Sequence, residues 1–455
     1  MFRLPAEEEL TDIKLGEFLG QHAAVCTRRY KKLQDAYRTD YSIFHQEKKP
    51  DWKPDNRIAV NFAKYIVDTM NGFFIGHPIK VIADEEKISK FVELVDQYND
   101  QDDNNAELSK VCSIFGKGYE MYYVDPIGKI GITYLSPMDA FMIYDDSVLC
   151  NPRFFVRLYM DAENVLHGSI SDESKVRYFT QKGKLVWEAE EKIHGFDGVP
   201  AVEYVENEEK MGIFEPVMTM INAYNKAISE KANDVDYFAD AYMKILGPVV
   251  DEKSMEGIRS NRIINFEGDT EKIVVDFLQK PDGDTTQENL INRLEKLIFQ
   301  ISMVANISDE NFGASSGIAL KYKLQAMSNL EKTKERKFTS GMNRRYKLIF
   351  SNPVSGMKKD DWVKLHYHFT PNFPANLLEE SQIAQNMEGT VSKETQLSVL
   401  SIVDNVQAEL DRIKTEQEEA QVTAVSSRLN ERLSDGQQDV LESEGSGTAQ
   451  AQYQR

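Results

Sequence analysis

Cysteine is the first shortage in this sequence, with three residues among 455. Cys26, Cys112 and Cys150 are far apart, are odd in number and form no CxxC pair. Zinc sites and disulfide frameworks both need cysteines that are closely spaced or paired in number. The sequence therefore predicts neither, and three isolated thiols fit a reducing compartment.

Long apolar runs and positive charge are also in short supply. The most apolar early stretch, residues 58–76, is broken by polar and charged residues and falls short of the ~18 uncharged residues of a membrane span. The start, MFRLPAEEEL, lacks the apolar core of a signal peptide. We therefore expect no membrane association. With 54 basic against 74 acidic residues the net charge is -20, the opposite of an ordinary nucleic-acid binder.

Motifs for nucleotide hydrolysis are missing. NFGASSGIALKYK, residues 311–323, is rich in Gly, Ala and Ser, but a Walker A loop needs GxxxxGK[ST]. Gly313 and Gly317 are four apart, and Ile-Ala follows where Lys and Ser or Thr are required. FGKGY at 115–119 fails as well, because Tyr follows its second Gly. The small-residue stretch thus needs another explanation.

Metal-binding and catalytic arrangements are also absent from the local sequence. DQYNDQDDNN, residues 96–105, has Gln101 where an EF-hand loop needs Gly, and we interpret it as a solvated acidic loop. His366 and His368 would share one face of a strand, but no Cys or HExxH motif accompanies them, so a polar strand face is the better interpretation. We expect no metal, no cofactor and no catalytic residue.

The patterns that are present begin with an α+β region. Residues 8–38 and 60–73 have helical patterns, and Gly-His-Pro ends the second of them. From about 117 to 205, short β-branched and aromatic runs alternate with Gly, Pro and Asp turns, as in strands and hairpins. The first 210 residues are therefore predicted to form an α+β domain.

Two striped helices follow, on either side of a compact insert. Apolar residues in 213–243 are spaced alternately by four and three, with Lys231 in the one gap. Residues 284–305 open with a capping-box pattern and repeat that spacing. The insert between them, residues 247–283, predicts strands with one short helix. The stripes are Val217, Ile221, Tyr224, Ile228, Val235, Phe238 and Tyr242 in the first helix, and Leu290, Leu294, Leu297, Ile301 and Val304 in the second.

A third long helix, predicted for 317–350, is unusually basic. Nine basic residues against two acidic ones give it a net charge of +7. A solvated charged face and a grip on DNA both explain such a run. Beyond it, a strand is predicted at 362–369, and residues 377–432 look helical throughout. The tail, 433–455, lacks apolar periodicity and is expected to be disordered.

The three long helices each carry one apolar stripe and leave much polar surface. Helices of this kind are stabilised mainly by packing against neighbours. Further copies of the same chain are the economical source of such neighbours, so the pattern favours an oligomer.

Seven stretches, taken in order, resemble the portal (head-to-tail connector) proteins of long-tailed double-stranded DNA bacteriophages. The resemblance covers about residues 50–425, and the ordered set is specific. The stretches are NRIAVNFAKYIVDTMNGFFIGHPI, GKGYEMYYVD, SPMDAFMIYDD, GVPAVEYVEN, FEPVMTMINAYNKAISEKANDVDYFADAYMKILG, SSGIALKYKLQAM and VSKETQLSVLSIVDNVQAELDRI.

The resemblance implies a mostly helical α+β portal fold that assembles into a ring of about twelve copies around a channel. The ring sits at one capsid vertex, and DNA passes through it during packaging and ejection. An acidic ring would let DNA slide instead of stick. The implied regions are a wing (1–212, completed by about 351–376), stem helices (213–246 and 284–305), a clip (247–283), a tunnel loop (306–317), a long basic helix joining channel and wing (318–350), a helical crown (377–432) and a disordered tail (433–455).

The resemblance also implies where the working surfaces lie. The tunnel loop projects into the channel, where Gly and Ser let it shift as a duplex passes, and Lys321 and Lys323 are the expected lysine contacts to DNA. The clip faces the packaging motor (terminase) and later a head-tail adaptor protein. The candidates are Asn306, Ser308, Asp309, Glu310, Asn311, Phe312, Gly313, Ser315, Ser316, Gly317, Lys321 and Lys323 in the channel, and Asp251, Glu252, Lys253, Glu256, Arg259 and Arg262 in the clip.

Major capsid and scaffolding proteins are further implied partners, and the implied location is the virion, with the bacterial cytoplasm during assembly. Two alternatives stay open. One is a DNA-processing enzyme subunit, a packaging ATPase or nuclease, that grips DNA with the basic helix; the missing Walker A motif and metal cluster argue against it. The other is a helical capsid scaffold without a channel, which particle shape would distinguish.

Overall fold

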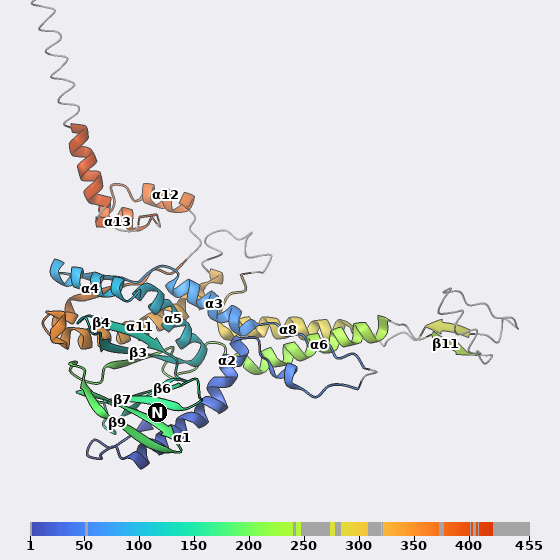
Figure 1. The fold of residues 1–455 in the computed structure, drawn as a ribbon. Helices are drawn as coiled ribbons and strands as arrows, with labels where there is room; N and C mark the ends of the chain where they lie inside the picture. The colour runs from blue at the N-terminus through green and yellow to red at the C-terminus, as the bar shows by residue number, and fades with distance from the viewer. Residues whose placement is uncertain are drawn as a thin grey trace, which may run out of the picture. The chain divides into compact units, whose positions relative to one another are not determined.

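The computed structural model describes residues 2–50, 53–239, 243–246, 274–277, 284–307, 320, 322–372, 377–400, 402–403, 406–407 and 409–421 (Figure 1). The chain divides into two compact units, one up to Asn372 and one from Phe373 onward. Both helices and sheets are present, so the α+β class is confirmed.

The first unit opens with the expected helices. α1 (Asp12–Val25), a π-helical turn (Cys26–Tyr30) and α2 (Lys31–Tyr37) follow one another without a break. α3 (Phe62–Ile75) begins where the Asn61 side-chain oxygen accepts the backbone N–H of Lys64 at 2.9 Å, an N-cap that satisfies one of the free donors of the first turn.

Residues 96–105 are not a solvated loop, so that expectation is wrong. α4 (Glu86–Tyr98) ends there and α5 (Gln101–Phe115) begins there, with Asp100 at φ 47° in the short connection. The first turns of α5 bury Gln101 and Asn105, which are 2% and 4% exposed. These two polar side chains belong to a buried hydrogen-bond network that also includes Arg345, which lies far along the chain.

The strands predicted between 117 and 205 form two sheets. One has the order β10-β3-β4 and is antiparallel. The other has the order β1-β5-β6-β7-β8-β9, in which β1 (Phe2–Arg3) runs parallel to β5 and the other neighbours are antiparallel. The remaining strands are β3 (Lys117–Val124), β4 (Ile130–Leu135), β5 (Ala140–Tyr144), β6 (Pro152–Met160), β7 (Leu166–Ser171), β8 (Lys175–Lys182), β9 (Lys184–Ile193) and β10 (Ala201–Val205).

The strand predicted at 362–369 is present as β13 (Leu365–His368), and it returns the later chain to this first region. β13 pairs antiparallel with β2 (Lys80–Ala83). α11 (Gln325–Ser351) packs on β10 and α3. At Gly341 a Cβ would lie 2.3 Å from the Tyr204 ring, so only glycine permits this approach of helix to strand.

The basic helix α11 differs from its prediction in two ways. It begins at Gln325 instead of Gly317, after a turn at Leu324. Its apolar stripe is thin because charged side chains complete the buried face: Lys334 and Arg345 are 2% and 0% exposed. These two residues are therefore neither part of a solvated face nor exposed for binding DNA.

Both buried cations pair with carboxylates of the same chain. Arg345 Nε lies 2.8 Å from Glu120 Oε2, and its Nη2 donates to Asn105 Oδ1 at 2.6 Å. Lys334 Nζ donates to Glu206 Oε2 at 2.8 Å. A buried charge is tolerated only when it is paired and hydrogen-bonded, so these contacts tie α11 to β3, α5 and the end of β10.

The second unit contains α12 (Leu377–Asn386), α13 (Lys393–Ser398) and helical residues from 409 to 421. A turn at 387–392 separates α12 from α13. Ser392 then caps the start of α13, because its side-chain oxygen accepts the backbone N–H of Thr395. The prediction of helix throughout 377–432 is therefore wrong within the described residues. Residues 422–432 and the expected disordered tail lie outside them.

The Arg345 network can be tested against an exposed arginine next to it. We expect Arg345→Met to lower the free energy of unfolding by about 3–5 kcal/mol, because Glu120 then stays buried without its cation. Urea unfolding followed by circular dichroism at pH 7 measures this. Arg344→Met is the matched control and should cost less than about 0.5 kcal/mol, because Arg344 is exposed. Equal losses in the two variants would contradict the network's role.

Candidate functional site

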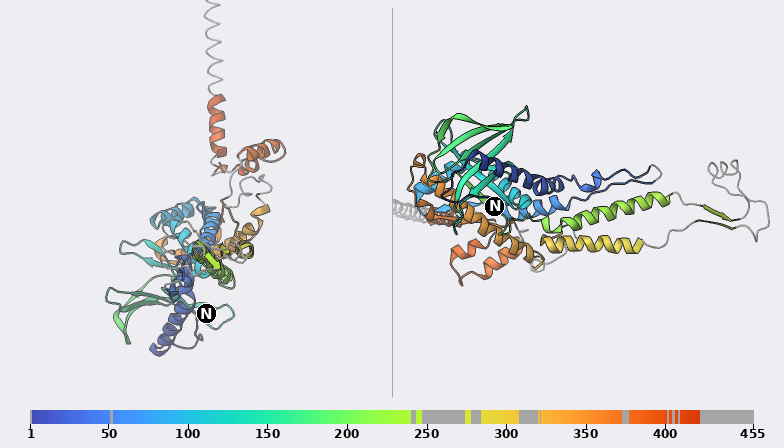
Figure 2. Two further views of the ribbon diagram at one scale, coloured as in Figure 1. Left: turned by 90° about the vertical axis from the view of Figure 1, so that its right-hand side faces the viewer. Right: turned by 90° about the horizontal axis from the view of Figure 1, so that it is seen from below.

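The α6–α8 hairpin is the first part of the candidate site. α6 (Met218–Ala239) and α8 (Asp284–Ser302) lie side by side (Figures 1 and 2). Lys231, the residue that interrupts the expected stripe of α6, pairs with Glu288 of α8. Next to this pair, Gln287 Nε2 donates to Asp234 Oδ2 at 3.0 Å. Polar contacts therefore hold this part of the hairpin together.

The expected stripes are only partly buried in the single chain. In the first stripe, Val217 just before α6 and Ile221 within it are fully buried, but Val235 is 61% exposed. In α8, the buried apolar residues are Ile291 and Ile298, one position beyond the expected Leu290 and Leu297. The sequence contains two adjacent apolar rows on α8, and in the folded chain, where α8 packs against α6, the second row is the buried one. The first row leaves Leu290 53% exposed and Ile301 43% exposed.

Two short strands lie between these helices in the chain. β11 (Met243–Leu246) pairs antiparallel with β12 (Val274–Phe277). Helix α6 was expected to run to 243 or 246, and this is wrong, because its described part ends at Ala239 and residues 243–246 are a strand. The candidate clip residues lie outside the described residues: Asp251, Glu252, Lys253, Glu256, Arg259 and Arg262.

A polar row on α6 binds the backbone of an extended segment before α3. We call Asn225, Ser229 and Asn233 the polar row; they are 1%, 2% and 6% exposed. Their side-chain oxygens accept the backbone N–H groups of Val60 at 2.8 Å, Ile58 at 2.9 Å and Asn56 at 2.6 Å. The polar surface expected on this helix is thus used inside the chain.

The spacing of the polar row explains why this pairing works. Residues four apart on a helix are separated by about 6 Å along its axis. Alternate residues of an extended chain are separated by about 6.6 Å. The two repeats nearly coincide. The three side chains of the polar row, each about one helical turn from the next, therefore reach every second N–H of residues 56–60. The hairpin is thereby fixed to the segment that leads into α3.

The segment between α8 and α11 is held at both ends. On the α8 side, Val304 is buried, and the N–H of Ile307 donates to the Tyr65 hydroxyl of α3 at 2.8 Å. On the α11 side, Leu324 and Met327 are 3% and 2% exposed. Both anchors therefore belong to the core of the first unit.

Two of the candidate channel residues are described, and they lie near these anchors. Asn306 donates to Glu295 of α8 at 3.3 Å, and Lys323 is exposed. The others lie outside the described residues: Ser308, Asp309, Glu310, Asn311, Phe312, Gly313, Ser315, Ser316, Gly317 and Lys321.

Among the described residues, no group of three His, Cys, Asp or Glu side chains is arranged to hold a metal. His366 and His368 are both exposed on β13, and His366 Nε2 lies 3.7 Å from Asp84. The cysteines are free thiols. In the same part of the chain, every helix is too short or too polar to cross a lipid bilayer.

Comparison with known proteins decides which family this architecture represents. The family described as "Phage portal protein, SPP1 Gp6-like" matches residues 18–423. The chain belongs to this family of phage portal proteins. It is also similar to a protein named "Portal protein" from Clostridium phage phiCD119, with 22% identity over 438 residues, which cover 88% of this chain and 93% of that protein. The resemblance seen in the sequence is thereby confirmed.

Sequence reasoning overlooked the residues that fix this portal-family hairpin in place. Asn225, Ser229 and Asn233 follow at intervals of four on one side of α6, next to its apolar stripe. The available signal was a row of short polar residues at helical spacing. The extended segment that these residues bind lies far away in the sequence and has no strand periodicity. The segment's own pattern gave no indication that its N–H groups needed partners.

Loss of one member of the polar row should loosen the bound segment. We expect Asn225→Ala to leave the Val60 N–H buried without an acceptor and to destabilise the fold by about 1–3 kcal/mol. Hydrogen exchange of the amides from 56 to 60 should become about tenfold faster. Asn222→Ala, at an exposed position of the same helix, is the control. Unchanged exchange in Asn225→Ala would show that the row is not needed to hold the segment.

Proposed function

We propose that this chain forms a ring of about twelve subunits around a channel at one capsid vertex, through which double-stranded DNA is packaged and later ejected. The family match over residues 18–423 carries this proposal. The role is structural and not enzymatic, which agrees with the missing nucleotide and metal motifs of the sequence.

We assign the implied regions to elements of the chain. The wing would be residues 1–212, completed by about 351–376, where β13 pairs with β2. The stem would be residues 213–246 and 284–305, which include α6 and α8. The clip would be residues 247–283, which include β12, and β11 just before it pairs with β12. The crown would be residues 377–432, which include α12 and α13.

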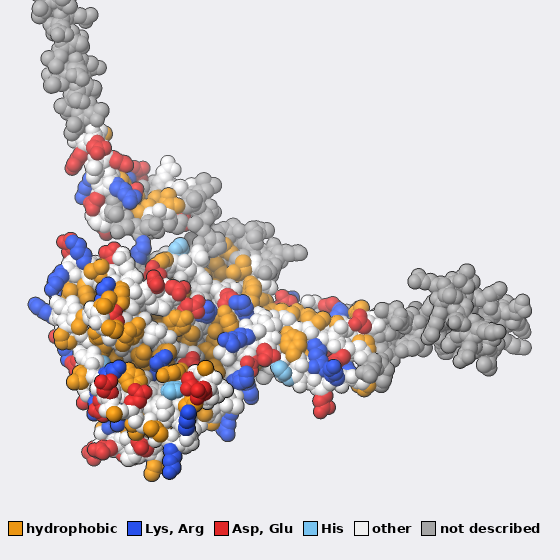
Figure 3. Space-filling view, viewed as in Figure 1, with side chains coloured by type: hydrophobic (Ala, Val, Ile, Leu, Met, Phe, Trp, Pro, Cys, Tyr) orange, Lys and Arg blue, Asp and Glu red, His pale blue; other side chains and the backbone are white. Residues whose placement is uncertain are grey.

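Exposed apolar residues on the hairpin support contacts between subunits. Val235, Leu290 and Ile301 are 61%, 53% and 43% exposed in the single chain. Figure 3 shows hydrophobic side chains among the charged ones along this part of the surface. A helix with apolar residues beyond its buried face gains stability when a neighbour covers them. In a ring, each hairpin would be covered by the hairpins of adjacent copies.

Charge supports a channel along which DNA slides. The basic residues of α11 are partly consumed inside the chain, since Lys334, Arg345 and Lys337 pair with Glu206, Glu120 and Glu208. The electrostatic environment of the DNA would then be set mainly by the net charge of -20 on each copy. Few phosphate contacts mean weak, non-sequence-specific binding, which lets a duplex move. Lys321 and Lys323, beside the tunnel loop, are the proposed exceptions.

The partners follow from the same assignment. The clip would dock the packaging motor, terminase, and afterwards the head-tail adaptor proteins. Major capsid and scaffolding proteins would contact the ring in the capsid. The protein would act in the virion, after assembly in the bacterial cytoplasm.

Ring formation is the direct test. Negative-stain electron microscopy of the purified chain, with mass measurement in solution, should show rings of about twelve copies with a central hole. A stable compact dimer or tetramer without a hole would contradict the proposal.

A matched pair of variants tests the hairpin contact. Leu290→Glu should reduce the ring fraction at least about tenfold without unfolding the chain, because a charge would be buried between copies. Ile193→Glu is the control, since Ile193 is 87% exposed on β9, outside the hairpin. Mass photometry measures the ring fraction. Rings that tolerate Leu290→Glu as well as Ile193→Glu would place the contact between subunits elsewhere.

A further inference from the structure

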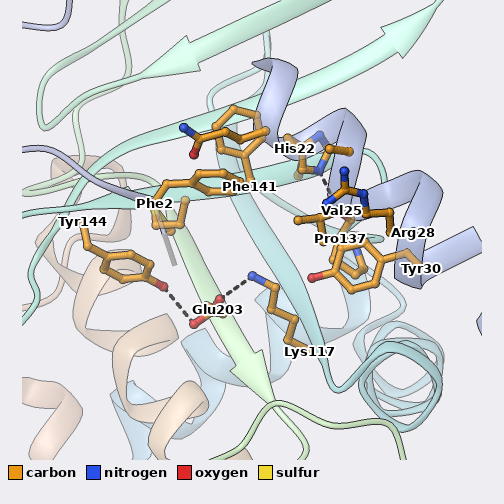
Figure 4. Close-up of a pocket in the computed structure, with 14 residues that line it drawn as sticks. Phe2, His22, Val25, Arg28, Tyr30, Lys117, Pro137, Phe141, Tyr144 and Glu203 are labelled. Carbon is orange, nitrogen blue, oxygen red and sulfur yellow. Dashed lines mark hydrogen bonds and ion pairs between the residues drawn. The ribbon is translucent and has the colours of Figure 1, made fainter. Parts of the chain in front are cut away.

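A cavity of about 400 Å³ lies between the N-terminal helices and the sheets of the first unit. α1 and its π-helical continuation form one side, and β5 and β10 contribute the other (Figure 4). Cavities of this volume are typical of sites for small organic molecules. The proposed portal role does not use this cavity.

Aromatic rings form much of its wall. Phe2, on the two-residue strand β1, packs against Phe141 with 4.9 Å between ring centroids. Tyr30 and Tyr144 line the cavity as well (Figure 4). His22 closes one end, where its Nε2 lies 2.8 Å from the Pro137 carbonyl oxygen. Such walls favour a flat apolar group.

The π-helical turn shapes the open side. The N–H of Lys31 donates to the carbonyl of Cys26, five residues earlier. In an α-helix, residue 30 would lie about 140° around the axis from residue 25. The wider turn brings Val25, Arg28 and Tyr30 to the same cavity. π-helical turns are rare and occur frequently at functional sites.

The polar floor is centred on Glu203, whose carboxylate is already saturated. Lys117 donates to Oε1 at 3.0 Å and Tyr144 donates to Oε2 at 2.9 Å. Tyr119 and Lys210 also donate to this carboxylate. Burial alone would raise the pKa of Glu203, but the two ammonium groups outweigh it and lower the pKa to about 2. Glu203 is therefore an anion that needs no further donor.

The charges around the cavity leave a positive excess. Lys117 and Lys210 face one carboxylate, and Arg28 adds a cation at the exposed mouth. Burial lowers the pKa of His22, which keeps its imidazole neutral at pH 7. Within the described chain, Lys117 hydrogen-bonds to Glu203 and Tyr119. An ammonium has three N–H donors, so one remains for a ligand.

We propose that this cavity binds a small aromatic carboxylate. The ring of the ligand would lie among Phe2, Phe141 and Tyr144. Its carboxylate would accept hydrogen bonds from Lys117 and Tyr30 and would face Arg28 at the mouth. Charge-assisted hydrogen bonds of this kind are stronger than those between neutral groups, so the carboxylate is the feature that sets the affinity.

Calorimetric titration of the full chain with indole-3-acetate tests this. We expect saturable binding with a dissociation constant below about 1 mM. Indole-3-acetamide, which has the same ring without the charge, should bind at least about tenfold more weakly. No saturable binding of indole-3-acetate, or equal binding of the two compounds, would overturn the proposal.

Two variants and one control locate the site. Arg28→Met should weaken indole-3-acetate binding about five- to tenfold, and Val25→Trp, which fills the mouth, should abolish it. Arg38→Met is the matched control, because Arg38 is also exposed but does not line the cavity, and it should bind as the unchanged chain does. Thermal melting confirms that each variant is folded. If Val25→Trp fails to fold, Arg28→Met against Arg38→Met decides; equal affinity in these two would overturn the proposal.

Discussion

The burial of one guanidinium group, that of Arg345, constrains much of the first unit. Arg345 is 0% exposed and its partner Glu120 is 1% exposed. A charge removed from water is tolerated only if its partners are placed accurately. Glu120 comes from β3, Tyr204 from β10 and Asn105 from α5. Three elements must therefore be correctly placed around α11 in the folded chain.

Lys334 repeats this arrangement eleven residues earlier on the same helix. Eleven residues are close to three full turns, so both cations point to one side of α11. Lys334 donates hydrogen bonds to Glu206, which directly follows β10, and to the Ser113 hydroxyl on α5. Two pairs along one helix fix its rotation as well as its position. The helix thereby connects the segment that follows the hairpin to the sheets.

The sequence predicts elements well where a repeat is local. α3 and the strands between 117 and 205 follow from apolar spacing and turn residues alone, whereas β1 was not predicted. Prediction from the sequence fails where the burial of a residue depends on partners far along the chain. Asn105 and Arg345 are 240 positions apart, so nothing near residues 96–105 indicates that a polar helix start is buried. On α8, two apolar rows compete, and only contact with other elements shows that Ile291 is buried and Leu290 exposed.

The site was predicted less completely than the fold, because its residues came from a family resemblance. Apolar spacing predicted the two helices of the hairpin, and the resemblance, whose family is confirmed, supplied the candidate residues, of which the structure describes Asn306 and Lys323 in the channel set. The assignment of regions and of individual residues stays a prediction. The polar row shows why: its role appears only when α6 and residues 56–60 are seen together.

Recognition by the polar row has a consequence for how this portal chain can change during evolution. α6 binds main-chain N–H groups, and these are the same for every residue except proline. The side chain of Ile58, which is 42% exposed, can therefore vary without loss of the contact, whereas Val60 also packs against the core. A single inserted or deleted residue between 56 and 60 would be far more damaging. It would shift the alternation by one and turn the bonded N–H groups away from their acceptors, so a change of length here would disturb the contact more than a change of side chain.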